Sequence, residues 1–61
     1  MTTDELKDAI RKWTAKNGQG PTFNDLHGVF GGSDDTLVDE LDKARQGNEI
    51  GKDTNGRYFV P

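Results

Sequence analysis

The segment of residues 33–50 constrains the fold most, because it combines a helix, a helix stop and the start of a strand. Ser33 is a preferred N-cap residue, so we expect a helix over residues 33–46. Gly47 is expected to end this helix, and Ile50 to begin a strand ahead of a turn-rich stretch. Three apolar residues share one face at the i, i+4, i+7 spacing: Leu37, Leu41 and Ala44.

Two further helices are predicted before this segment. Thr2 and Glu5 form a capping-box pattern that begins a helix over residues 2–17. Thr22 and Asp25 repeat the pattern in an acidic variant for a helix over residues 22–31. The expected apolar positions of the two helices are Leu6, Ile10, Trp13, Phe23, Leu26 and Phe30. We expect these six residues to be buried together with Leu37, Leu41, Ala44 and Ile50.

A tight turn and a hairpin complete the predicted layout. Gly31-Gly32 leads directly into Ser33, which leaves the short connection that is typical of a helix-turn-helix. Asn55-Gly56 is the strongest hairpin signal in the chain and predicts two strands over residues 49–60. Residues 1–61 are therefore expected to form one small α+β domain, with no second domain.

The composition sets limits on the function. Eleven Asp and Glu residues against eight Lys and Arg give a net charge of −3, opposite to the basic charge that nucleic-acid binders usually carry. The chain has no cysteine and one histidine, His27, so we expect no metal site and no cofactor. No residues are spaced as a nucleophile with its base, so we expect no enzyme and no small-molecule ligand. No apolar run reaches the length of a membrane span, and a cytoplasmic protein without membrane contact is expected.

Several short motifs, in this order and spacing, resemble the winged helix-turn-helix superfamily and are nearest to the DNA-binding domains of GntR-type regulators. The motifs are Pro21-Thr22, Ser33-x-x-Thr36-Leu37, Leu41, Gly47-x-x-Ile50 and Gly56-Arg57-Tyr58-Phe59-Val60. The resemblance implies three helices and a two-stranded wing, with the third helix in the major groove of DNA and the wing on the backbone or minor groove. It nominates as DNA contacts Ser33, Thr36, Lys43, Lys52 and Arg57. Asp34 and Val38 stand where family members commonly carry Arg or Lys.

The outward face of the third helix leaves two functions open. Opposite Leu41, a 100° advance per residue places Thr36, Asp39, Lys43 and Gln46, with Asp35 and Asp42 beside them. The first hypothesis is a regulatory protein that binds double-stranded DNA, with Gln46 and Asn55 added to the contacts above. The alternative is a protein-interaction module, or an inhibitor of a nucleic-acid-binding enzyme of phage or plasmid type, that uses Asp35, Asp39 and Asp42. These charges are also consistent with a solvated face without a partner, since the helix dipole favours acids in the first turn and bases in the last turn.

Overall fold

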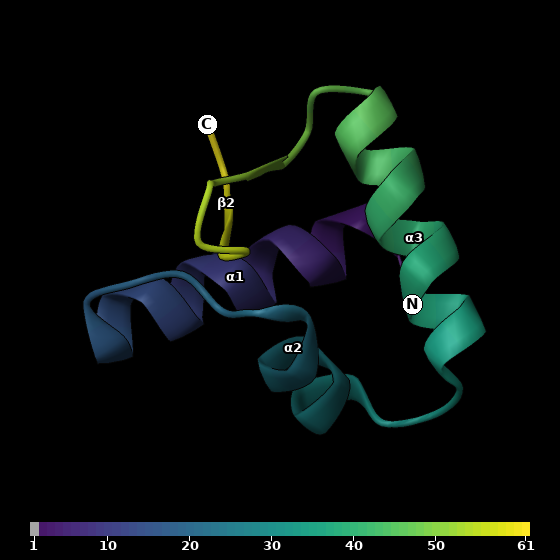
Figure 1. Cartoon of the computed structure of the whole chain (residues 1–61), viewed down its shortest axis with the longest axis horizontal. Coiled ribbons are helices and arrows are strands. Elements are labelled where there is room, and N and C mark those ends of the chain that lie inside the picture. The colour runs from purple at the N-terminus through teal and green to yellow at the C-terminus, as the bar shows by residue number, and fades with distance from the viewer. Residues whose placement is uncertain (1) are drawn as a thin grey trace.

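A computed structural model describes residues 2–61 and confirms the predicted order of three helices followed by a two-stranded antiparallel hairpin (Figure 1). Figure 1 shows α3 running across the ends of α1 and α2. In this view α2 lies below α1 and the hairpin lies above it. The strands are shorter than predicted, whereas the helices begin and end close to the predicted bounds. These elements are α1 (Thr3–Asn17), α2 (Phe23–Phe30), α3 (Asp34–Gln46), β1 (Gly51–Lys52) and β2 (Tyr58–Phe59).

All three helices begin at the predicted N-cap. The Glu5 amide donates to Thr2 Oγ1 at 3.2 Å, and the Thr2 amide donates to Glu5 Oε1 at 3.0 Å. The same reciprocal pair joins Thr22 and Asp25 at 3.3 and 3.0 Å. Ser33 Oγ accepts the Thr36 amide at the start of α3. These side chains satisfy amide groups that have no partner inside a helix, which fixes where each helix starts.

Helix α3 ends at Gln46 with Gly47 as its C-cap, as predicted, but Gly47 itself is not left-handed. Gly47 has a φ of −83°, and the left-handed residue is Asn48, with a φ of 59°. The Asn48 amide donates to Arg45 O at 3.1 Å, and the Glu49 amide donates to Ala44 O at 2.9 Å. This pair of bonds is a Schellman motif with Asn48 in the left-handed position that glycine usually takes. The reversal directs the chain away from α3 and into β1.

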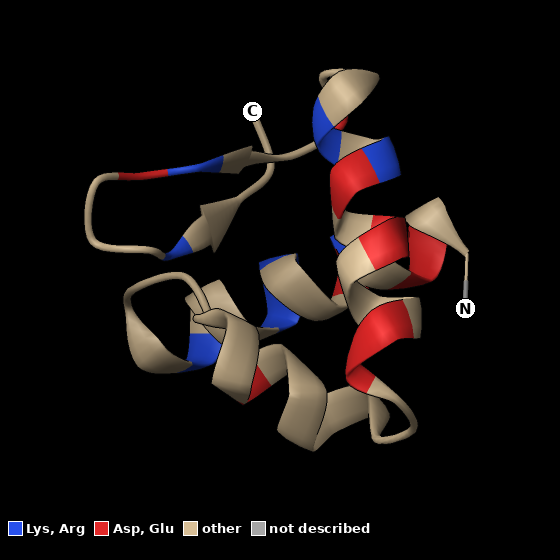
Figure 2. Ribbon diagram, turned by 45° about the vertical axis from the view of Figure 1, so that its right-hand side comes forward, with Lys and Arg blue, Asp and Glu red and all other residues tan. Residues whose placement is uncertain are grey.

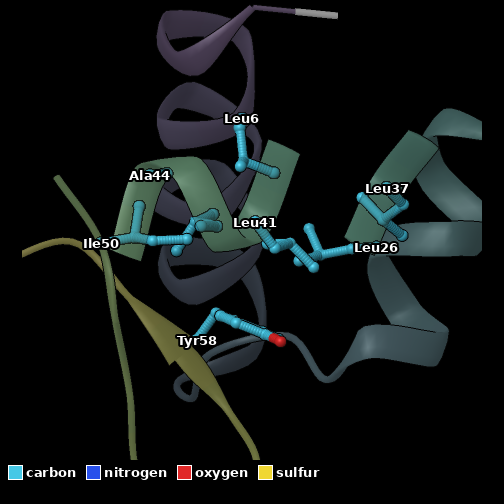
Figure 3. Packing of buried hydrophobic residues seen from close by; sticks show 8 residues of the cluster. Leu6, Leu26, Leu37, Leu41, Ala44, Ile50 and Tyr58 are labelled. Carbon is cyan, nitrogen blue, oxygen red and sulfur yellow. The ribbon is translucent and has the colours of Figure 1, made fainter. Parts of the chain in front are cut away.

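The core contains side chains from all three helices, from Ile50 just before β1 and from Tyr58 of β2 (Figure 3). Its buried members are Leu6, Ile10, Leu26, Leu37, Leu41, Ala44, Ile50 and Tyr58. Phe23 and Phe30 are only partly buried but pack against this cluster, as does Val60. The prediction for Trp13 is wrong: its side chain is partly exposed and lies outside the cluster. Tyr58, which was not predicted as core, fills the space beneath the hairpin.

The hairpin loop contains three residues, 54–56. Gly56 has a φ of 78° and donates its amide to Asp53 O at 3.1 Å, while the Asp53 amide donates to Arg57 O at 2.9 Å. Asp53 Oδ1 also accepts the amides of Asn55 and Arg57, each at 2.9 Å. The predicted turn at Asn55-Gly56 is therefore present, as a three-residue loop with glycine in the left-handed position. Asp53 acts as the cap of this loop.

The loop before α2 lies against β2. The Tyr58 amide donates to Pro21 O at 2.8 Å, and Arg57 Nη1 donates to Gly20 O at 2.9 Å. A Cβ atom at Gly20 would overlap the Tyr58 carbonyl oxygen, so only glycine permits this approach. These contacts fix the hairpin relative to the helices.

Candidate functional site

The solvent-facing side of α3 holds the charge imbalance of the whole chain. Helix α3 carries five of the eleven carboxylates and two of the eight cations, whereas the remaining residues carry six of each. Figure 2 shows the acidic residues gathered along α3 and the basic residues of the hairpin on the other side of the molecule. We call Asp35, Val38, Asp39 and Asp42 the acidic face of α3. The net charge of −3 is therefore a local property of this helix.

Three carboxylates of the acidic face have no protein partner. Asp35, Asp39 and Asp42 are exposed, and within residues 2–61 none of them accepts a hydrogen bond or joins an ion pair. The two other acids of α3 do have partners: Asp34 Oδ1 lies 2.8 Å from His27 Nε2, and Glu40 Oε1 lies 3.9 Å from Lys43 Nζ. The unpaired carboxylates keep their full negative potential toward solvent.

An apolar side chain interrupts the acidic face. Val38 is 42% exposed, although it lies next to the buried Leu37 in sequence. Asp35 precedes Val38 by three residues and Asp42 follows it by four, so both lie beside it on the helix surface. The acidic face thus offers an apolar contact with carboxylates around it. In the sequence, Val38 stands out only as a position without the expected base; the signal for its exposure is an apolar residue that lies outside the buried stripe of the helix.

The predicted DNA contacts on α3 are divided between its two ends. At the first end, Ser33 Oγ and Thr36 Oγ1 lie 2.9 Å apart and bind each other as part of the N-cap. At the other end, Lys43 points into solvent with 72% of its side chain exposed, and Gln46 is exposed in the last turn. The acidic face separates these pairs. A nucleic acid lying along α3 would therefore meet carboxylates between the two groups of donors.

The predicted contacts on the hairpin are close together but partly engaged. Lys52 Nζ lies 5.6 Å from the centre of the Tyr58 ring, within the range of a cation–π contact. Arg57 uses Nη1 on Gly20 O, which leaves its other guanidinium donors available. Asn55 is exposed in the loop. Figures 1 and 2 both show this loop pointing away from α3, so the structure does not join the hairpin and α3 contacts into one cluster.

His27 links α2 to the start of α3. Its Nε2 lies 3.2 Å from Gly32 O in addition to the contact with Asp34, and its ring stacks on Phe23 with centroids 6.4 Å apart. Gly31 and Gly32 both have positive φ values, which only glycine adopts without strain, and they allow the chain to reverse within this short turn. His27 therefore contacts both the glycine turn and the first residue of α3.

A second pair fixes the other end of α3. Lys7 Nζ on α1 lies 2.7 Å from Glu49 Oε2, just after α3 ends. The hydrogen bond and the positive charge of Lys7 hold the pKa of Glu49 below its ordinary value. Burial raises the pKa of the Tyr58 hydroxyl above its ordinary value.

A second surface lies between α1 and α2. A groove of about 520 Å³ separates the two helices, and Trp13, Val29 and Phe30 give it an apolar lining. Val29 is 51% exposed, and Trp13 is only partly buried. The groove was not predicted from the sequence, because Trp13 has the spacing of a core residue and Val29 lies outside the predicted apolar positions of its helix. We call this feature the α1–α2 groove.

Other classes of site are not visible in the described part of the chain. No group of three or more metal-ligating side chains occurs within residues 2–61. None of the described helices has the length and apolar character needed to cross a bilayer. Searches of protein-family models, of curated proteins and of solved structures find no match for this chain.

Proposed function

We propose that the chain is a winged helix in which α2 and α3 form the helix-turn-helix and the hairpin forms the wing. The order of the elements, the glycine turn before Ser33 and the hairpin that follows α3 support this assignment. The hydrogen bond from the Tyr58 amide to Pro21 O supports it further, since it ties the wing to the segment between α1 and α2.

We propose further that the protein works by protein contact, with the acidic face of α3 docked on a basic partner. The observation that carries this proposal is the unpaired state of Asp35, Asp39 and Asp42 around the exposed Val38. In a major groove these three carboxylates, none of which forms an ion pair within the described residues, would approach two rows of phosphates. Against a basic protein they would speed association and select the partner, and Val38 would contribute apolar contact.

The chemistry of the partner follows from the charge pattern. Proteins that bind nucleic acids carry basic surfaces that face rows of phosphates. A helix with closely spaced carboxylates presents a similar row of negative charge. The proposed partner is therefore a nucleic-acid-binding protein, and the expected consequence of binding is competition with its nucleic acid.

The double variant Asp35→Asn/Asp39→Asn separates this proposal from binding of DNA by α3. Affinity capture from a lysate with the wild type and the variant as bait, followed by titration of the captured protein, measures the first interaction. We expect the variant to bind that protein more weakly, chiefly through a slower and less salt-sensitive association. If α3 instead enters DNA, the variant should bind random duplex DNA at low salt more tightly than the wild type, because two repulsive charges are gone.

A matched control removes the same charge elsewhere. Asp4→Asn deletes one exposed carboxylate from α1, outside the acidic face, and is compared with the single variant Asp39→Asn. Equal weakening by the two single variants would mean that net charge, and not the acidic face, attracts the partner. That result would contradict the proposal.

DNA binding through the wing is the second candidate function, and a separate observation favours it. Lys52 and Arg57 lie on the two sides of the hairpin loop, and the loop is directed away from the carboxylates of α3. Two cations so placed can contact a phosphate backbone or a narrow minor groove. Such binding would be weak and independent of the DNA sequence. It could serve regulation only if other contacts supplied the specificity.

A further inference from the structure

We propose that the α1–α2 groove is the contact surface of a symmetric dimer, in which α1 of a second copy of this chain lies antiparallel in it. The groove takes no part in the function proposed above, so the dimer can be tested independently of that function. The starting observation is that Trp13 and Val29 leave apolar surface exposed beside the groove. Exposed apolar surface of this kind commonly marks a site of contact with another molecule.

The residues that α1 contributes to the groove are arranged symmetrically. They are Glu5, Asp8, Ala9, Lys12, Trp13 and Lys16. Their spacings of three, one, three, one and three residues read the same in both directions, with the midpoint between residues 10 and 11. A two-fold axis at this midpoint would therefore place each lining residue of one copy opposite a lining residue of the other. A two-fold contact between identical patches is the commonest form of oligomer.

The charges along this stripe are complementary to themselves. The carboxylates lie toward the start of α1 and the lysines toward its end. In the antiparallel arrangement Glu5 faces Lys16 of the second copy, and the same pair recurs at the other end of the contact. Asp8 and Lys12 already neutralise each other within α1, with 3.0 Å between Asp8 Oδ2 and Lys12 Nζ. The two copies of Lys12 lie on either side of the two-fold axis, each beside its own Asp8, and the complementary pairs at the ends are what select a second copy as the occupant.

The middle of the contact combines the small Ala9 with the Asp8–Lys12 ion pair. Ala9 allows two helices to approach, and the pairing places Trp13 of the second copy opposite Asp8, in the groove that Val29 and Phe30 also line. An interface at the lower limit of about 1,000 Å² in total would use about one eighth of the 3935 Å² surface of each copy. We therefore expect a weak dimer with a Kd between about 10 µM and 1 mM.

Two measurements on the full chain test the dimer. Sedimentation equilibrium from micromolar to millimolar protein gives the Kd. Trp13 is the only tryptophan, so its fluorescence reports on the groove directly. We expect its emission to shift to shorter wavelength as the protein concentration rises through the Kd. A chain that stays monomeric at millimolar concentration would overturn the proposal, and so would a monomer whose groove takes up an apolar dye instead.

Charge variants test the symmetry of the contact. Lys16→Glu places two like-charge pairs at the ends of the dimer and should weaken it roughly tenfold. Arg11→Glu makes the same change on an exposed part of α1 outside the groove, and should leave the Kd unaltered. Glu5→Lys should also weaken the dimer, whereas an equal mixture of Lys16→Glu and Glu5→Lys should restore it as a heterodimer with both end pairs intact. Equal effects of Lys16→Glu and Arg11→Glu would overturn the proposal.

A further variant avoids the helix cap. Glu5 also accepts the Thr2 amide, so Glu5→Lys costs folding stability, which circular dichroism would detect. Val29→Glu leaves every cap in place and sets a charge in the apolar lining that α2 gives to the groove. We expect it to abolish dimerisation while the fold remains intact. A folded Val29→Glu variant that dimerises as well as the wild type would exclude this groove as the interface.

Discussion

Replacement of Leu41 by alanine tests whether the buried side of α3 is the one that holds the domain together. Leu41 is 2% exposed and lies at the centre of a core of only eight buried side chains. Truncation of such a leucine costs about 2–5 kcal/mol, through lost transfer free energy and the cavity that remains. At 0.05–0.15 kcal/mol per residue, a domain of this length has a free energy of unfolding of about 3–9 kcal/mol. Leu41→Ala should therefore remove at least about a fifth of the free energy of unfolding, and at the upper end of these ranges all of it.

Urea unfolding followed by far-UV circular dichroism measures this loss. With a slope of about 1 kcal/mol per molar urea for so small a protein, a cost of ~3 kcal/mol lowers the midpoint by about 3 M. Val38→Ala is the matched control, since Val38 lies on the same helix but is 42% exposed, and it should change stability by about 0.5 kcal/mol or less. A cost below ~1 kcal/mol for Leu41→Ala, or an equal cost for both variants, would refute the assignment of the buried face.

Three other predictions follow from contacts outside the core. Gly20→Ala should destabilise the domain, because its Cβ would overlap the Tyr58 carbonyl oxygen, and thermal unfolding would detect the loss. The pKa of Glu49 is lowered in the folded state, so the Lys7–Glu49 pair contributes to the free energy of unfolding above the ordinary pKa of about 4.5, and this contribution is lost as the pH falls through the lower pKa of the folded state. A pH series of urea midpoints should show the loss, and Lys7→Met should abolish this pH dependence. If the wing binds DNA, Lys52→Ala should lower the slope of log K against log salt by about 0.9, and an unchanged slope would exclude Lys52 as a phosphate contact.

The helix starts were predictable from the sequence because each depends on residues three positions apart. The pairs Thr2–Glu5 and Thr22–Asp25 fix their helices through local hydrogen bonds. The end of α3 at Gln46 was also predictable, but the left-handed residue after it was not, since both Gly47 and Asn48 can adopt that geometry. The hydrogen bonds of the following residues place Asn48 there.

Long-range contacts account for the remaining differences. Trp13 has the spacing of a core residue, but burial also requires a partner element, and the α1–α2 groove stays open around it. Tyr58 belongs to a strand of two residues, too short for alternation to indicate which side faces inward. Arg57 was predicted only as a DNA contact, and its hydrogen bond to Gly20 O, 37 residues earlier in the chain, was not predicted. On the acidic face of α3, the sequence predicted the exposed carboxylates but not the exposed Val38 among them.

An NMR titration with duplex DNA tests most directly whether the acidic face of α3 avoids nucleic acid. Backbone amide shifts of the labelled protein, recorded at low salt with increasing amounts of random duplex, report on α3 and the wing separately. Because the unpaired carboxylates of α3 repel phosphates, we predict no shifts over residues 34–42, with any changes confined to the hairpin around Lys52 and Arg57. Saturable shifts concentrated in residues 34–42 would show that DNA lies on the acidic face and would contradict the proposed function.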